Sequence, residues 1–142
     1  MSLSTAKTKK YEILEHVSDL KLRAFGKTKE ELFLNMLLGM SESQKPEIKK
    51  GKKTKREIKI KSLDLQTLLV DFLSETLYLS QVNREAYFNV KFRRFFDNEI
   101  EAELIGQKVE RFGEDIKAVT YHGLNIRQRE DGIREATILF DI

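Results

Sequence analysis

Two acidic groups are neighbours at the carboxyl end of the sequence. Asp141 precedes Ile142, the last residue, so a side-chain carboxylate and the α-carboxylate lie next to each other. The strand-like run ATILFDI (136–142) has no polar tail, so we expect the terminal carboxylate to be held against the fold. Mutual repulsion between the two anions favours a positive charge beside them. That charge is either a divalent cation or a Lys or Arg paired with Asp141, and the residues alone leave both open.

A third carboxylate nearby would complete a cation site. All-oxygen ligands suit Ca²⁺, Mg²⁺ or Mn²⁺ better than Zn²⁺, and the chain has no cysteine to supply a thiolate. The two histidines, His16 and His122, have no Cys or His at ligand spacing, which is typical of hydrogen-bonded structural histidines. The glycines form neither a P-loop nor a dinucleotide fingerprint, and no nucleophile elbow is present. We therefore predict no catalytic residue.

Positive charge is concentrated in two places. The net charge is +3, but 45–61 holds nine basic residues and two acids, and 1–10 holds three lysines and no acid, so the remaining chain is acidic. The segment Lys49–Arg56 is suited to gripping a phosphate backbone, yet it contains no aromatic residue for base stacking. It is interpreted either as an exposed, solvated loop or as a weak contact with tRNA or an acidic partner.

The elements that must position these groups follow from hydrophobic periodicity. A chain of 142 residues fits one domain, which we place at 11–142 after a flexible lead-in at 1–10. Thr28 and Glu31 have capping-box spacing before an amphipathic helix that contains Leu32 to Met40. Ser62 and Asp64 offer N-cap oxygens to a second helix, whose leucine-rich stripe is the best candidate for the centre of the core.

The remaining apolar runs alternate with a period of two. They predict strands at 11–14, 20–25 and 55–61, and several more from Tyr87 to the end, with hairpin turns at Asp97-Asn98 and Asp131-Gly132. The expected fold is α+β, with two helices packed on a mostly antiparallel sheet of about six or seven strands. No signal peptide or long apolar run is present, so we expect a cytoplasmic protein with no membrane contact.

Four sequence blocks resemble the archease family in order and spacing: YEILEHVSDLKLRAFGKTKEELF (11–33), LDLQTLLVDFLSETLYL (63–79), IKAVTYHGLNI (116–126) and the terminal ILFDI. The resemblance implies a small, non-catalytic cytoplasmic activator of the GTP- and metal-dependent RNA ligase of tRNA splicing, which promotes guanylylation and multiple turnover of that ligase. Two alternatives are an RNA-binding module that acts on tRNA-processing or modification enzymes and a chaperone-like protein.

The resemblance also implies site residues. The metal ligands would be Asp19, Asp141 and the terminal carboxylate of Ile142, which would explain why the chain stops where it does. Lys117 matches a family lysine that lies near these acidic ligands; the alternative is that it is an outward-facing strand residue. His16 and His122 fall within the matched blocks and are candidate residues for contact with a partner. Family members commonly read His-Thr-Ala-Asp where this chain reads His-Val-Ser-Asp (16–19), and Lys21 stands where a glycine is common. The aspartate is retained, and the lost threonine hydroxyl bears on the geometry of the site.

Overall fold

The computed structural model describes residues 9–15 and 19–142. Its elements in chain order are β1 (Tyr11–Glu15), β2 (Asp19–Gly26), α1 (Lys29–Ser43), β3 (Pro46–Ile48), β4 (Thr54–Lys61), α2 (Leu65–Asn83), β5 (Glu85–Phe96), β6 (Glu99–Phe112), β7 (Ala118–Gln128) and β8 (Arg134–Asp141).

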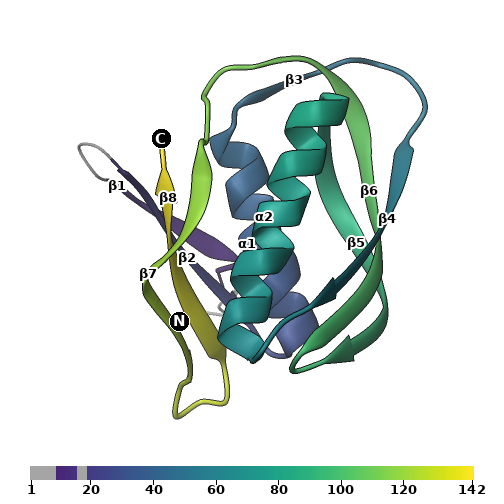
Figure 1. The fold of residues 1–142 in the computed structure, drawn as a ribbon. Helices are drawn as coiled ribbons and strands as arrows, with labels where there is room; N and C mark the ends of the chain where they lie inside the picture. Colours follow the sequence, from purple (N-terminus) through teal and green to yellow (C-terminus); the bar gives the residue numbers. More distant parts are fainter. Residues whose placement is uncertain (1–8, 16–18) are drawn as a thin grey trace, which may run out of the picture.

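The strands form two antiparallel sheets with the two helices between them (Figure 1). The first sheet has the order β1-β2-β8-β7; in the second, β6 pairs with β3 and β4 and also with β5. The predicted α+β class with two helices is thus confirmed. The described residues form eight strands, slightly more than the about six or seven expected, because the three-residue β3 lies in a polar stretch with no alternating pattern. These strands divide between two sheets, where the sequence predicts one.

Both helices begin at the predicted caps. Thr28 Oγ1 accepts a hydrogen bond from the Glu31 backbone N–H at 3.1 Å, and Asp64 Oδ1 accepts one from the Thr67 N–H at 2.8 Å. These bonds satisfy N–H groups that have no partner inside the helix. The Ser62 hydroxyl, the other predicted cap, instead donates to Asp71.

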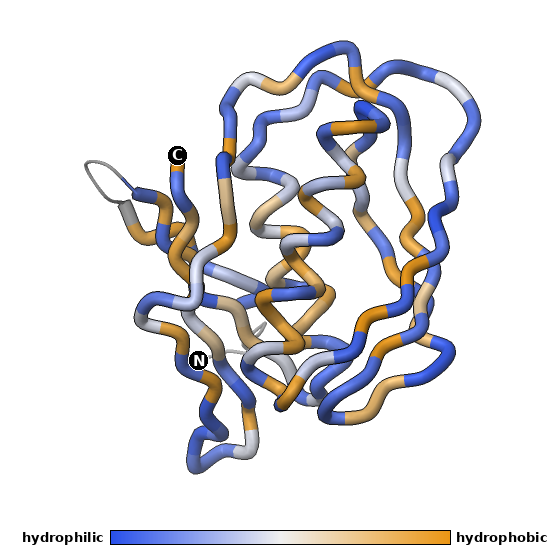
Figure 2. Tube along the Cα trace, viewed as in Figure 1, coloured by the Kyte–Doolittle hydropathy of each residue, from blue (hydrophilic) through white to orange (hydrophobic). Residues whose placement is uncertain are grey.

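The core lies between the sheets, where both helices bury their apolar stripes. Leu68, Leu69, Phe72 and Leu73 of α2 are fully buried, which confirms that this helix lies at the centre of the core. Phe33 of α1 packs on Phe72 with ring centroids 5.6 Å apart. Figure 2 shows apolar segments of both helices in the middle of the molecule and a hydrophilic connection between β3 and β4 at its edge. No helix in the described ranges is both long and apolar enough to cross a membrane.

One buried carboxylate ties three strands of the second sheet together. The Glu85 side chain at the start of β5 is fully buried and accepts two hydrogen bonds of 2.9 Å from Arg56 of β4. The Tyr87 hydroxyl donates to it at 2.7 Å, and the Lys108 ammonium of β6 lies 3.3 Å away. A buried charge is tolerated when it is paired and hydrogen-bonded, as this one is.

Candidate functional site

Asp19 and Asp141 meet at one end of the first sheet. Asp19 is the first residue of β2, Asp141 is the last residue of β8, and the two are direct partners in the antiparallel register of these strands. Side chains of directly opposed residues point to the same face, with Cβ atoms about 4.5–5.5 Å apart. The fold therefore brings together two predicted ligands from opposite ends of the sequence.

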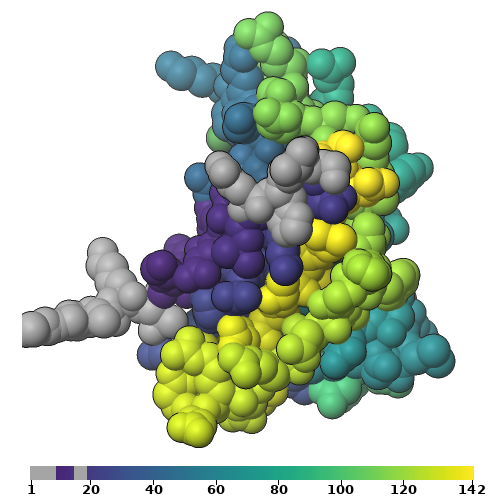
Figure 3. All heavy atoms as spheres, turned by 90° about the vertical axis from the view of Figure 1, so that its left-hand side faces the viewer, coloured from purple at the N-terminus to yellow at the C-terminus, as the bar shows by residue number. Residues whose placement is uncertain are grey.

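Strand alternation places both carboxylates on the face of the sheet that points away from the helices. Leu22 and Ala24 of β2 and Ile138 and Phe140 of β8 are buried against the core, so the residues between them face outward. Asp19 is half-buried and Asp141 is exposed. Figure 3 shows this sheet from its side of the molecule, with the yellow β8 between the purple strands β1 and β2 and the yellow-green β7.

The start of β7 lies beside Asp141, on the opposite side of β8 from Asp19. Ala118 is the register partner of Asp141, and the Lys117 backbone N–H donates to the Asp141 carbonyl at 2.7 Å. The Lys117 side chain is exposed, and Ile142 is 44% exposed. Asp141 is therefore held by backbone pairing with both neighbouring strands, while its side chain and Ile142 remain open to solvent.

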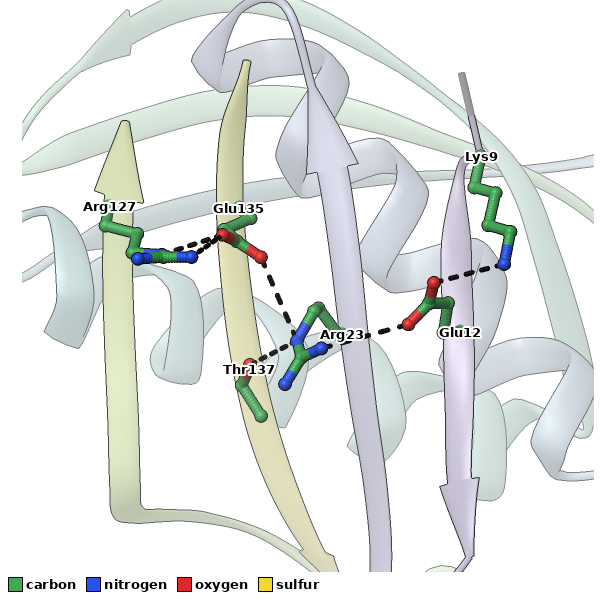
Figure 4. Close-up of polar contacts among 6 residues, drawn as sticks. All are labelled: Lys9, Glu12, Arg23, Arg127, Glu135 and Thr137. Carbon is green, nitrogen blue, oxygen red and sulfur yellow. Dashed lines mark hydrogen bonds and ion pairs between the residues drawn. The ribbon is translucent and has the colours of Figure 1, made fainter. Parts of the chain in front are cut away.

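A chain of ion pairs crosses the outer face of the same sheet (Figure 4). The Arg23 guanidinium of β2 lies 3.9 Å from Glu12 of β1 and 3.8 Å from Glu135 of β8. The Arg23 Nε also donates to Thr137 Oγ1 at 3.3 Å, and Glu135 accepts a 2.7 Å hydrogen bond from Arg127 of β7. Because these contacts cross all four strands, they favour the register that sets Asp19 opposite Asp141.

Lys21 is the residue of this face nearest to Asp19 along β2. It lies two positions along the strand, on the same outward face, and is half-buried opposite Leu139. Two residues on the same face of a strand, two positions apart, lie about 7 Å from each other. A positive charge at that distance opposes the binding of a cation. The charge of Lys21 would therefore weaken a cation site formed by the two aspartates.

The donor set suits a hard divalent cation if the chain terminus takes part. In the described part of the chain, no three His, Asp or Glu side chains gather closely enough to hold a metal ion. The Asp19 and Asp141 side chains supply carboxylate oxygens, and the α-carboxylate of Ile142 follows directly. Oxygen ligands of this kind match Ca²⁺, Mg²⁺ or Mn²⁺.

The other predicted residues are not all at this tip. His16 lies outside the described residues. His122 is exposed on β7, where the pairing with β8 is irregular between Thr120 and Asn125 and Gly123 has a positive φ of 68°. The basic segment 49–56 forms the connection between β3 and β4 and the start of β4, on the second sheet.

A contact between β7 and α2 was not apparent from the sequence. The Tyr121 hydroxyl donates to Asp71 Oδ1 at 2.6 Å, and the Ser62 hydroxyl donates to Asp71 Oδ2 at 2.6 Å. The hydrogen bond from Tyr121 and burial raise the pKa of this tyrosine. The contact anchors the irregular part of β7 on the helix. No local pattern signals it, because Tyr121 lies fifty residues after Asp71 in the chain.

The fold and this site define a class of small two-sheet α+β proteins with an acidic pair at adjoining strand ends. A profile of the Archease protein family matches residues 11–142. The chain belongs to the archease family.

Relatives and solved structures agree with this assignment. The chain is 42% identical to Protein archease of Methanosarcina barkeri, covering 94% of this chain and 97% of that protein. It is 29% identical to Protein archease of Pyrococcus abyssi, with 94% and 99% covered. The solution structure of Methanobacterium thermoautotrophicum protein 1598 superposes with a TM-score of 0.67 at 25% identity over 95% of this chain and 100% of that one.

A crystal structure from Thermotoga maritima, described as an archease and possible chaperone, has the same fold, with a TM-score of 0.67 at 21% identity, covering 91% of this chain and 94% of that one. The names of the family and of these relatives describe no catalytic activity.

Proposed function

We propose that this archease is a non-catalytic activator of the GTP- and metal-dependent RNA ligase of tRNA splicing, and that it acts through the tip formed by Asp19, Asp141 and Ile142. Family membership supports this proposal, because the resemblance to archeases implies activation of this ligase. The observation that carries the proposal is the direct register of Asp19 with Asp141 at an exposed sheet end.

In this proposal, the tip docks at the ligase active site. The two aspartates and the terminal carboxylate hold a Ca²⁺, Mg²⁺ or Mn²⁺ ion, and such an ion neutralises phosphate charge of the kind that develops in guanylyl transfer. Backbone bonds to β2 and β7 keep the Asp141 position fixed. Lys117, whose side chain is exposed, contacts the ligase or its nucleotide in this proposal.

The decisive experiment is multiple-turnover ligation of a tRNA exon substrate by the ligase of the same organism. Reactions contain GTP and Mn²⁺, with this protein absent or at substoichiometric concentration. We expect strong stimulation by the unaltered chain and its loss with Asp141→Asn. Asp97→Asn, a change of the same charge at the β5–β6 turn, is the matched control and should stimulate normally. An active ligase that does not respond to the unaltered protein would refute the proposal.

A second candidate function is binding of unfolded proteins. Tyr78 and Val82 are 58% and 60% exposed on one face of α2, and the Thermotoga maritima archease is described as a possible chaperone. Suppression of aggregation of several unrelated clients, lost in Tyr78→Ser/Val82→Ser and unchanged in Asp141→Asn, would favour this function over ligase activation.

A further inference from the structure

A basic hollow of about 510 Å³ lies on the second sheet, where the β3–β4 connection meets the C-terminal end of α2 and strand β6. Five of its lining residues are cationic, namely Lys49, Lys50, Lys52, Arg84 and Lys108, and Glu110 is the one acid in the lining. In Figure 1 the β3–β4 connection and the C-terminus lie on opposite sides of the helices, so this hollow is separate from the acidic tip.

The cations of the hollow come from distant parts of the chain and are of two kinds. Arg84 and Lys108 are held at its base: Arg84, in the left-handed conformation, donates to the Glu110 carbonyl at 2.8 Å, and the Lys108 ammonium donates to the Asn83 carbonyl at 3.1 Å. The Lys49 backbone N–H donates to the Lys108 carbonyl at 2.8 Å, which fixes the start of the connection on β6.

The lysines of the connection itself are available to a ligand. Lys45 and Arg56, to either side of it, are paired with Glu114 and Glu85. The lysines at 49, 50 and 52 are exposed, and no ion pair within residues 9–15 and 19–142 engages them. A cluster of unneutralised ammonium groups around a concave surface attracts a polyanion and raises its local concentration.

The tertiary structure also supplies an aromatic ring beside these lysines. Phe88 of β5 is 41% exposed, and the Lys53 ammonium lies 6.0 Å from its ring centroid. Lys53 directly follows Lys52 of the hollow. Single-stranded bases stack on exposed aromatic rings that lie next to a row of cations.

We propose that this surface, made of Lys49, Lys50, Lys52, Lys53, Arg84 and Phe88, binds single-stranded nucleic acid, with the backbone phosphates on the cations and one base stacked on Phe88. The exposed aromatic ring beside the cations favours a nucleic acid over an acidic protein, because this combination matches the stacking platforms that bind single strands. The proposal does not depend on the acidic tip, since no residue is shared between the two surfaces.

The test is fluorescence anisotropy with labelled 12-mers of mixed-sequence single-stranded RNA, single-stranded DNA and duplex DNA, each titrated at several salt concentrations. We expect the single strands to bind more tightly than the duplex. Lys50→Ala/Lys52→Ala should weaken binding about tenfold and make the slope of log K against log salt less steep by about 1.4. Phe88→Ala should weaken binding by roughly 5- to 100-fold, and Phe88→Tyr should restore it.

The matched control is Lys59→Ala/Lys61→Ala, which removes the same charge from exposed positions farther along β4. It should bind nearly as well as the unaltered chain. Equal losses from both lysine pairs, or no binding of single strands at low salt, would overturn the proposal. The proposal would also be overturned if Phe88→Ala bound the single strands as tightly as the unaltered chain and polyglutamate displaced them completely. That outcome would assign the surface to an acidic protein. Asp141→Asn should bind the oligonucleotides normally whether or not ligase activation holds.

Discussion

Asp19 and Asp141 are direct cross-strand partners, one opening β2 and the other ending β8. Their carboxylates share the outward face of the first sheet, and the backbone of Lys117 holds Asp141 from the other side. This relationship turns two residues at opposite ends of the sequence into one acidic tip, and it makes the tip sensitive to any change in charge on that face.

Neutralising one acid of the pair should weaken binding of divalent cations. For Asp141→Asn we expect the affinity for Ca²⁺ or Mn²⁺ to fall at least tenfold, because a carboxylate ligand becomes a neutral amide. Isothermal titration calorimetry measures this directly. Asp97→Asn is the control for net charge, and equal affinities in the two variants would remove Asp141 from the ligand set.

Extending the chain tests the terminal carboxylate separately. Two added glycines after Ile142 move the α-carboxylate away from Asp141 while every side chain is kept. We expect weaker Ca²⁺ and Mn²⁺ binding in the same calorimetric assay, with the unfolding midpoint unchanged. Unaltered affinity would show that Ile142 is not a ligand.

Removing the charge of Lys21 should have the opposite effect. An ammonium about 7 Å from a divalent ion costs on the order of 1 kcal/mol at the dielectric constant of water, which we take for a site open to solvent, so Lys21→Ala should raise cation affinity about two- to tenfold. Raising the salt concentration should shrink the gain because the interaction is screened. Lys61→Ala, on the second sheet, serves as the control. A fall in affinity would mean that Lys21 supports the site through packing and not through its charge.

The buried Glu85 carboxylate should make the second sheet sensitive to acid. Burial raises the pKa of Glu85, but hydrogen bonds from Arg56, Tyr87 and Lys108 outweigh burial and hold it below its ordinary value of 4.5. Since the folded-state pKa is the lower one, the stabilisation is present above pH 4.5 and is lost as the pH falls through the folded-state pKa.

Glu85→Gln should lower the free energy of unfolding by about 2 kcal/mol at neutral pH, because the amide removes the negative charge and replaces one of the two acceptor oxygens with an NH₂ donor that faces Arg56 or Lys108. Urea unfolding at pH 7 and at pH 3 measures both effects. The difference in free energy of unfolding between Glu85→Gln and the unaltered chain should be smaller at pH 3 than at pH 7. A constant difference would show that the ionised carboxylate does not carry the stabilisation.

The hydrogen bond from Tyr121 to Asp71 should stabilise the attachment of β7 to α2. We expect Tyr121→Phe to cost about 1 kcal/mol and to speed amide hydrogen exchange in the irregular part of β7. Tyr78→Phe, which alters an exposed tyrosine of α2, should change neither quantity. Equal exchange rates in both variants would contradict an anchoring role for Tyr121.

Local chemistry in the sequence determined the elements of this protein. The Thr28 and Asp64 caps, the turn between Phe96 and Glu99, and the leucine stripe of α2 all depend on residues a few positions apart, and the structure confirms each of them. The family was also readable from four ordered blocks. The short β3 was not predictable, because three residues in a polar stretch show no period and pair only when β6 is beside them.

Tertiary structure decided which distant groups meet. Strand patterns place Asp19 one residue before a predicted strand and Asp141 within another, but they do not say that β2 and β8 are neighbours, since pairing partners depend on how the whole chain packs. The same is true of Phe88 and Lys53, whose proximity depends on β4 and β5 lying on either side of β6. The basic segment lacks an aromatic residue in the sequence, and only the folded sheet brings one to it, because contacts between strands are set by registers that no local pattern encodes.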